Sequence, residues 1–156
     1  MFDPARGYPR VVPYLRYVDP ASAVRWLVEV LRATEALRMT LPDGRIGHAE
    51  LAIGNAVVSV GLALEPARDV GAPMTRTTLR TMTLVFVDDV DEAVAKATQY
   101  GGSIIDPPTD QPWGLRQAIV SDPGGYLWEP SRHLRDVPPE SWGARQLGTL
   151  PGAGHG

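Results

Sequence analysis

The chain repeats its own pattern at a fixed offset, and this repeat limits the folds open to it. Residues 11–19 and 81–89 each read as an apolar strand that ends at an aspartate. Without any gap, the equivalent positions include Asp19 and Asp89, Gly44 and Gly114, and Gly54 and Gly124. Two copies are too few for a solenoid. The repeat therefore predicts two half-domains with a shared core, which can enclose a cleft whose equivalent positions face one ligand.

Composition narrows the class of protein. The 156 residues fit one domain, and 44% hydrophobic content is enough for a packed core. A net charge of -3 lacks the basic excess of nucleic-acid-binding proteins. The sequence contains no cysteine, which excludes disulfides and thiolate chemistry, and no apolar run long enough for a membrane span. Residues 1–6 lack the features of a signal peptide, so we expect a cytoplasmic protein.

The first half, about residues 11–64, predicts a β-α-β-β-β unit. Asp19 is placed to cap a helix whose first residue is Pro20, and an apolar stripe at helical spacing follows. Gly54-Asn55 is typical of a tight hairpin turn. The predicted strands cover residues 11–18, 35–41, 46–53 and 56–62.

The second half, about residues 80–132, predicts the same unit after a linker at 65–79. Asp88 or Asp89 is expected to cap its helix, and Gly101-Gly102 to end it. Asp106-Pro107-Pro108 is expected to form a loop after a short strand. The predicted strands cover residues 80–87, 103–105, 115–121 and 126–130. Residues 134–156 are rich in proline, glycine and polar residues and predict a tail that docks partly through Trp142.

The motifs resemble the vicinal oxygen chelate superfamily, which includes glyoxalase I, bleomycin-resistance proteins and extradiol dioxygenases. The stretches 87–93, 122–129 and 48–54 carry the resemblance, and 108–116 is similar to the PhnB-like, bleomycin-resistance-like branch. The resemblance implies an α+β fold within residues 1–143. Two βαβββ modules would form a curved mixed sheet, with a cupped ligand cleft and the helices outside. It also implies a homodimer.

Metal-dependent members of the superfamily take ligands from the first and last strand of each module. Mapped by the resemblance, these positions are Val12, Ser59, Met82 and Glu129. Only Glu129 is a competent ligand, because valine has no donor atom and a thioether is too soft for the usual divalent ions. The resemblance therefore predicts no catalytic metal and no cofactor, although His48 and Glu50 offer a way to rebuild a site.

Strand alternation and the resemblance together predict which side chains line the cup. The set is mostly apolar with a few polar groups, as in small-molecule sites: Tyr14, Arg16, His48, Glu50, Ser59, Met82, Leu84, Phe86, Arg116 and Glu129. Trp113 is expected at the rim or in a dimer interface. Trp128 is expected to point into the core.

Several side chains keep two interpretations. His48 and Glu50 share one face of a strand, so they either grip a ligand or work as acid and base, or are satisfied locally. Arg16 either pairs with an anionic ligand or forms an ion pair with Glu129.

Three functional hypotheses follow. The first is a metal-free protein that binds a small, aromatic or amphipathic molecule, as drug-resistance members do. The second is an enzyme, with His48, Glu50 and Glu129 as candidate catalytic residues in a metal-dependent lyase or dioxygenase, or in a cofactor-free isomerase or hydrolase. The third is a purely structural or interaction role. None of the three includes a nucleic-acid or membrane partner.

Overall fold

The computed structural model describes residues 8–63 and 81–148, so the predicted linker at 65–79 lies outside the described residues. The elements, in chain order, are β1 (Tyr14–Tyr17), α1 (Pro20–Leu31), β2 (Thr34–Thr40), β3 (Ile46–Ile53), β4 (Ala56–Leu62), β5 (Thr83–Phe86), α2 (Val90–Gln99), β6 (Ser103–Asp110), β7 (Leu115–Ser121), β8 (Leu127–His133) and the short 3-10 helix η2 (Pro139–Trp142). The order confirms two βαβββ modules. None of these helices is long and apolar enough to cross a membrane.

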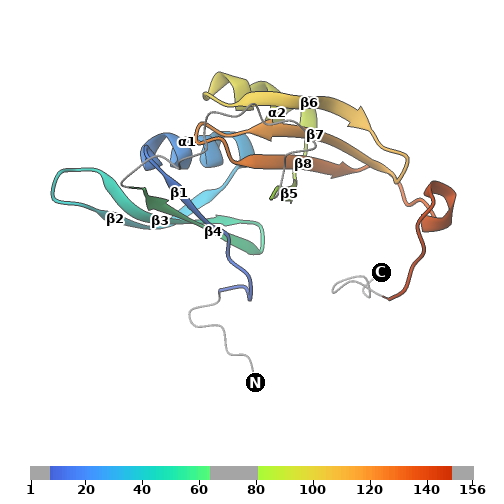
Figure 1. The fold of residues 1–156 in the computed structure, drawn as a ribbon, viewed down its shortest axis with the longest axis horizontal. Helices are drawn as coiled ribbons and strands as arrows, with labels where there is room; N and C mark the ends of the chain where they lie inside the picture. The colour runs from blue at the N-terminus through green and yellow to red at the C-terminus, as the bar shows by residue number, and fades with distance from the viewer. Residues whose placement is uncertain (1–7, 64–80, 149–156) are drawn as a thin grey trace.

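Each module builds its own four-stranded mixed sheet (Figure 1). The strand orders are β1-β4-β3-β2 and β5-β8-β7-β6, so the first strand of each module lies parallel to its last and forms one edge. The remaining pairs are antiparallel hairpins. The α+β fold class is thus confirmed, with the strands divided between two sheets where the sequence predicted one.

The two helices begin at the predicted aspartates. The Asp19 carboxylate accepts a hydrogen bond from the Ser22 backbone N–H, and Asp89 accepts one from Glu92, so each satisfies an otherwise free N–H of the first turn. At the far end of α2, Gly101 adopts φ +92°, a left-handed conformation that glycine accepts at little cost. The predicted starts of both helices and the predicted end of α2 are therefore confirmed.

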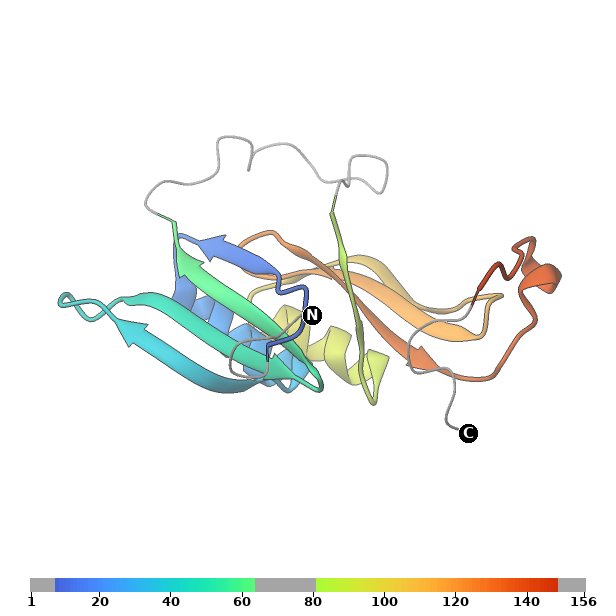
Figure 2. The same ribbon diagram turned by 90° about the horizontal axis from the view of Figure 1, so that it is seen from below.

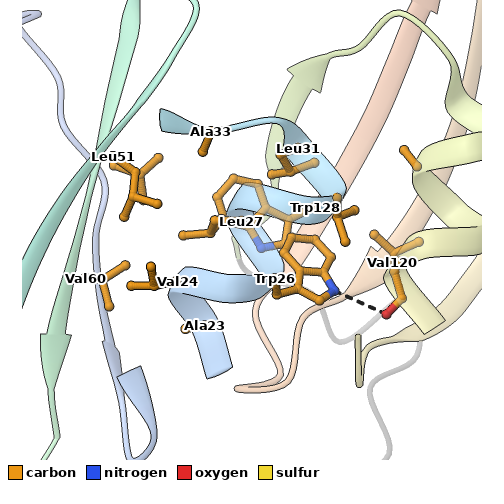
Figure 3. Packing of buried hydrophobic residues seen from close by; sticks show 14 of the residues in the cluster. Ala23, Val24, Trp26, Leu27, Leu31, Ala33, Leu51, Val60, Val120 and Trp128 are labelled. Atoms are coloured by element: carbon orange, nitrogen blue, oxygen red, sulfur yellow. Dashed lines mark hydrogen bonds between the residues drawn. The ribbon is translucent and has the colours of Figure 1, made fainter. Parts of the chain in front are cut away.

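A single core joins the two modules, and the helices lie within it. Figure 3 shows α1 between the strands of the first module and those of the second. Trp26 of α1 and Trp128 of β8 are almost fully buried, with ring centroids 6.0 Å apart. The Trp26 indole N–H donates to the Ala97 carbonyl of α2 at 3.2 Å, which satisfies the polar atom of a buried side chain. The prediction that Trp128 belongs to the core is confirmed.

A buried carboxylate fastens the first module to the second. Asp122, in the β7–β8 turn, accepts hydrogen bonds from the Tyr17 hydroxyl at 2.5 Å and from the Trp128 indole at 3.1 Å. Burial raises the pKa of Asp122, and burial beside this carboxyl raises the pKa of Tyr17 far above its ordinary range. Nearby, the Tyr126 hydroxyl accepts from Arg16 N and donates to Arg16 O, both at 3.1 Å. Tyr126 thereby caps the free edge of β1 at Arg16.

The sequence prediction placed a loop where the structure continues a strand. β6 runs through Asp106, Pro107 and Pro108 to Asp110, with one register shift before the prolines and one across them. β6 is the outermost strand of its sheet. Proline lacks an N–H and is tolerated at such an edge or at a bulge, so the proline pair bends the strand without ending it.

Equivalent residues of the two modules are not separated by one constant offset in sequence. Arg16 and Phe86 are equivalent in the repeat, and they pair with the equivalent residues Gly61 and Ser131 in their sheets. His48 also pairs with Gly61, so a gapless repeat would place Ala118 opposite Ser131, but Gln117 holds that position instead. A register shift between Met39 and Thr40 in the first module accompanies this change. The assumption of a gapless repeat was therefore wrong for β3 and β7.

After β8 the chain crosses back to the β6–β7 turn. The backbone N–H groups of Leu134 and Arg135 donate to the Gly114 carbonyl at 2.9 and 3.3 Å. η2 then brings Trp142 against Trp113, with ring centroids 6.0 Å apart. Figure 2 shows η2 beyond the far end of the second sheet. Trp142 thus contacts the second module through Trp113, as expected for a tail that docks partly through this residue.

Candidate functional site

Each sheet has one face packed on the core and one open face that points away from it. In the first module, Leu15, Tyr17, Ala49, Leu51, Val58 and Val60 pack in or against the core. Alternation along the strands places the intervening residues on the other side, here called the first open face: Tyr14, Arg16, His48, Glu50, Ser59 and Gly61. The structure thus brings together all five residues predicted for this face.

Tyr14 lies across the first open face because its neighbour has no side chain. A Cβ added to Gly61 would come within 2.5 Å of the Tyr14 hydroxyl, so only glycine leaves room for the ring. The Tyr14 ring meets the His48 ring edge to face, with centroids 5.6 Å apart. More than half of the tyrosine side chain stays exposed. The result is a flat aromatic surface beside an imidazole.

His48 and Glu50 form a local polar cluster. The His48 Nε2 atom lies 3.2 Å from the Glu50 Oε1 atom, and the Tyr8 hydroxyl donates to Glu50 Oε2. The two side chains are only 28% and 16% exposed. His48 and Glu50 are therefore satisfied by local contacts, which is one of the two interpretations that the sequence left open. Sequence reasoning missed Tyr8, because an aromatic residue in an irregular arm carries no periodicity.

The second open face has a different character. Leu84 and Phe86 of β5 pair with Glu129 and Ser131 of β8, and Gln117 of β7 pairs with Ser131. Leu84 and Phe86 are exposed, whereas Gln117 and Ser131 are buried. Met82, also exposed, precedes β5 and shares this alternation. This second open face is thus apolar along β5 and polar along the neighbouring strands β8 and β7. Its residues are Met82, Leu84, Phe86, Gln117, Glu129 and Ser131.

A chain of hydrogen bonds fixes Trp113 at the end of this face. The Trp113 indole N–H donates to Gln117 Oε1 at 2.8 Å, and the Gln117 amide donates to Ser131 Oγ at 2.9 Å. Trp113 remains 37% exposed and Trp142, packed against it, 40%. The structure therefore holds two exposed indole rings in a defined orientation. Both interpretations of Trp113, rim contact and interface residue, stay predictions.

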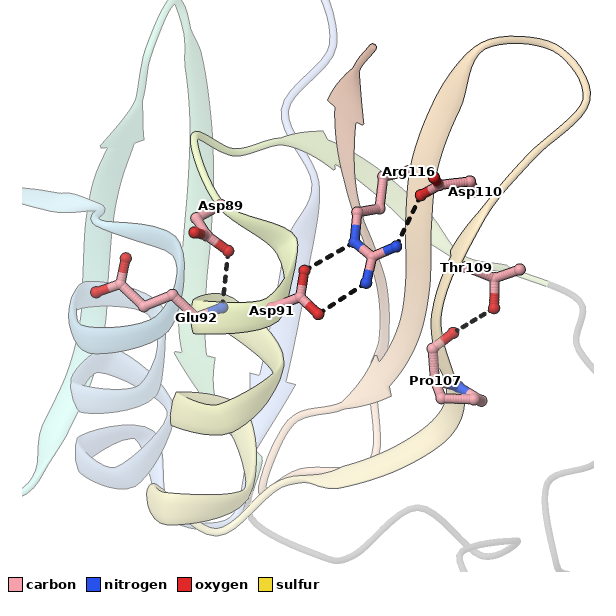
Figure 4. Close-up of polar contacts among 7 residues, drawn as sticks. All are labelled: Asp89, Asp91, Glu92, Pro107, Thr109, Asp110 and Arg116. Carbon is pink, nitrogen blue, oxygen red and sulfur yellow. Dashed lines mark hydrogen bonds and ion pairs between the residues drawn. The ribbon is translucent and has the colours of Figure 1, made fainter.

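Arg116 does not join the other predicted lining residues. It lies on the same side of β7 as the core residues Ala118 and Val120. Its guanidinium pairs with Asp91 of α2 through two hydrogen bonds, at 2.7 and 2.8 Å, and with Asp110 of β6 at 2.7 Å (Figure 4). These carboxylates hold the pKa of Arg116 well above its usual range.

Arg116 therefore fastens α2 to its sheet, and we correct its assignment to the ligand face. The residue on the open side of β7 is Gln117, which the sequence analysis missed. The run Ala118-Ile119-Val120 is apolar on both faces, so alternation gave no signal there.

The four mapped metal positions do not make a divalent-ion site. Ser59 is buried on β4, Met82 lies before β5, and Val12 lies before β1. Glu129 supplies the one carboxylate among the four. Within residues 8–63 and 81–148, no group of three histidine, aspartate or glutamate side chains is close enough to hold a metal. These donors therefore do not fit the metal that metal-dependent members of the superfamily would hold here.

Arg16 reaches neither Glu129 nor any other carboxylate in the described part of the chain. Its Nη2 atom donates to the Leu62 carbonyl at 3.2 Å. The ion pair considered between Arg16 and Glu129 is thus not formed within the single chain. The two residues belong to separate sheets, which explains the difference.

The architecture agrees with comparisons to known proteins. Residues 9–129 match the Glyoxalase/Bleomycin resistance protein/Dioxygenase superfamily, and the chain belongs to this superfamily. Two uncharacterized mycobacterial proteins, Mb0911c of Mycobacterium bovis and Rv0887c of Mycobacterium tuberculosis, are each 33% identical to it over 132 residues. The match spans 83% of this chain and 86% and 77% of theirs.

Two solved structures show the same fold. TioX from Micromonospora sp. ML1 is 39% identical, with a TM-score of 0.61 over 81% of this chain and 99% of TioX. The fosfomycin resistance protein FosX from Mesorhizobium loti is 16% identical, with a TM-score of 0.55 over 80% of this chain and 91% of FosX. The likeness to FosX concerns the fold alone.

Proposed function

We propose that this protein binds a small aromatic or amphipathic molecule on its open faces without a catalytic metal. The observation that carries the proposal is the exposure of large apolar side chains on these faces: Tyr14 at 56%, Leu84 at 46% and Phe86 at 62%. Monomeric proteins rarely expose clustered apolar side chains without a binding role. The poor donor set at the metal positions favours binding over metal-assisted chemistry.

The two faces suit two parts of one ligand. Tyr14 and Phe86 offer flat rings for aromatic contacts. Glu50, His48 and Arg16 offer charged or hydrogen-bonding groups for a polar end. An amphipathic ligand matches both faces, which supports that class over a purely apolar one.

A homodimer is part of the proposal. Each open face is exposed in the single chain, so a second copy that covers these faces would bury the apolar side chains and enclose the ligand. Tyr126 caps the β1 edge at Arg16, which disfavours association through pairing of β1 with another strand. We therefore propose that copies meet through their open faces.

The finer family assignment is also a proposal. The stretch 108–116 supports the PhnB-like, bleomycin-resistance-like branch, and such a protein would act by sequestering a toxic compound, giving antibiotic resistance. FosX is a fosfomycin resistance protein of the same fold.

One observation favours a second candidate function. His48 lies 3.2 Å from Glu50, which Tyr8 also contacts, and a carboxylate that orients an imidazole is a common acid–base arrangement. A cofactor-free isomerase or hydrolase would use His48 as its base. Loss of turnover in His48→Ala with ligand binding retained would support this alternative.

Native mass spectrometry of freshly purified protein tests the main proposal. We expect a dimer without stoichiometric metal, carrying an organic adduct that decreases in the variant Phe86→Ser. Leu147→Ser is the matched control, because Leu147 is 87% exposed in the C-terminal segment. One divalent ion per chain would contradict the proposal and favour metal-dependent chemistry.

A further inference from the structure

Because of the internal repeat, the contact between the modules has two related ends. At one end β1 meets the β7–β8 turn, and at the other β5 meets the β3–β4 turn. A side chain fills the first of these ends. There, Tyr17 at the end of β1 lies on the β7–β8 turn. A Cβ added to Gly124 would collide with the Tyr17 ring. The ring also contacts Tyr126, with centroids 5.0 Å apart, and its hydroxyl bonds Asp122. A phenol side chain thus fills this end.

The other end has the same backbone parts without the ring. By the offset of the repeat, Val87 takes the place of Tyr17, and the β3–β4 turn at Gly54 takes the place of the β7–β8 turn. A Cβ added to Gly54 would meet no atom within 4 Å. A pocket of about 280 Å³ opens here. Its walls come from both modules and include Val30, Leu31, Ile53, Phe86, Val87 and Ala93.

Charged side chains of both signs form much of the remaining lining: Arg32, Asp88, Asp89, Glu92 and Lys96. Glu92 pairs with Arg32 at 2.9 Å and with Lys96 at 3.0 Å, and all three line the pocket. Figure 4 shows Glu92 at the start of α2, next to α1. Arg32 has φ 54°, the one positive φ at a non-glycine position in the described residues. These charged side chains offer hydrogen bonds to the hydroxyl group of a ligand, while the apolar side chains of the lining accept a ring.

We propose that this pocket binds a single-ring aromatic molecule of the phenol class, in the position that the Tyr17 ring occupies at the related end. The volume supports one ring, since it lies near the lower limit of the roughly 300–1,000 Å³ typical of pockets for larger ligands. The site is separate from the ligand position proposed on the open faces, although Phe86 borders both.

The test uses p-cresol, which is the side chain of tyrosine as a free molecule. Methyl NMR spectra are recorded during a titration of the full chain. We expect saturable shifts and intermolecular NOEs at Val30, Leu31, Ile53 and Val87, with a Kd of about 1 mM, as suits so small a ligand. The variant Val87→Tyr restores the missing ring and should weaken p-cresol binding by roughly tenfold or more, because the pocket is then occupied. The matched control Leu147→Tyr adds a phenol at an exposed site and should bind as the wild type.

Three results would overturn the inference. They are an absence of saturable shifts in the wild type, NOEs confined to the open faces around Tyr14, or unchanged binding in a folded Val87→Tyr protein. The NOEs of the wild type decide the question if Val87→Tyr fails to fold. Binding at the open faces alone would leave the proposed function standing while removing this second site.

Discussion

The two modules share a topology but contribute different side chains to the contact between them. The first module supplies Trp26 and Tyr17. Each of them meets an aromatic ring of the second module, Trp128 or Tyr126, as well as a small residue. Trp26 lies beside the Ala97 carbonyl and Gly102 of the second module, and Tyr17 lies on Gly124. At the repeat-equivalent positions the first module's rings are replaced by Lys96 and Val87. The two modules therefore contribute unlike side chains to one shared core.

The largest expected effect comes from removing the main ring of this contact. Trp26→Ala should lower the free energy of unfolding by about 3–5 kcal/mol, because it leaves a large cavity in the core. Lys96→Ala, at the equivalent position of the second module, should leave the urea midpoint nearly unchanged, since Lys96 is partly exposed and its ion pair with Glu92 is a surface pair. Equal losses in the two variants would show that the modules contribute alike.

A smaller loss of stability is expected from adding a methyl group at Gly124, on which the Tyr17 ring packs. Gly124→Ala should cost about 1–3 kcal/mol, because the new methyl group meets a ring held by buried hydrogen bonds. Gly54→Ala has open space around it, so its cost of about 1 kcal/mol comes from φ +56° alone. Thermal unfolding of both variants checks the order. A reversal would mean that the Tyr17 end is no tighter than the Val87 end.

The pH dependence of stability should report on Tyr17. Its pKa is raised in the folded protein, so above pH 10 the unfolded chain loses this proton while the folded protein keeps it. The stability from the protonated phenol is therefore complete below about pH 10 and falls above it by about 1.4 kcal/mol per pH unit. Tyr17→Phe should remove this part of the alkaline slope in urea titrations between pH 9 and 11. An identical slope in both proteins would contradict the buried phenol.

The smallest effect is expected at Arg116. Because its guanidinium is held by Asp91 and Asp110 on the helix side, Arg116→Gln should not change binding of the amphipathic aromatic dye ANS, followed by fluorescence. Phe86→Ser, on the open side of the same sheet, should weaken it. Weaker ANS binding in a folded Arg116→Gln protein would return Arg116 to the ligand face.

Local signals made much of the fold predictable. Asp19 and Asp89 marked the helix starts because capping chemistry depends on neighbours in sequence. The faces of β1, β3 and β5 followed from the alternation of side chains along a strand. Alternation failed at β7, where Ala118-Ile119-Val120 is apolar throughout. The prediction of a loop at Pro107-Pro108 failed for another reason, because no local pattern reveals that these prolines lie at a sheet edge.

The sequence by itself determined the repeated βαβββ order, the helix caps, the burial of Trp128 and the presence of a single carboxylate among the four mapped metal positions. These properties depend on residue type and on contacts between near neighbours. Only the tertiary structure decided that the strands form two sheets, that Gln117 replaces Arg116 on the open face, and that Tyr8 contacts Glu50. It also decided that one end of the module contact is filled and the other open. Each of these depends on side-chain volume and register between segments far apart in the chain, which sequence spacing does not encode.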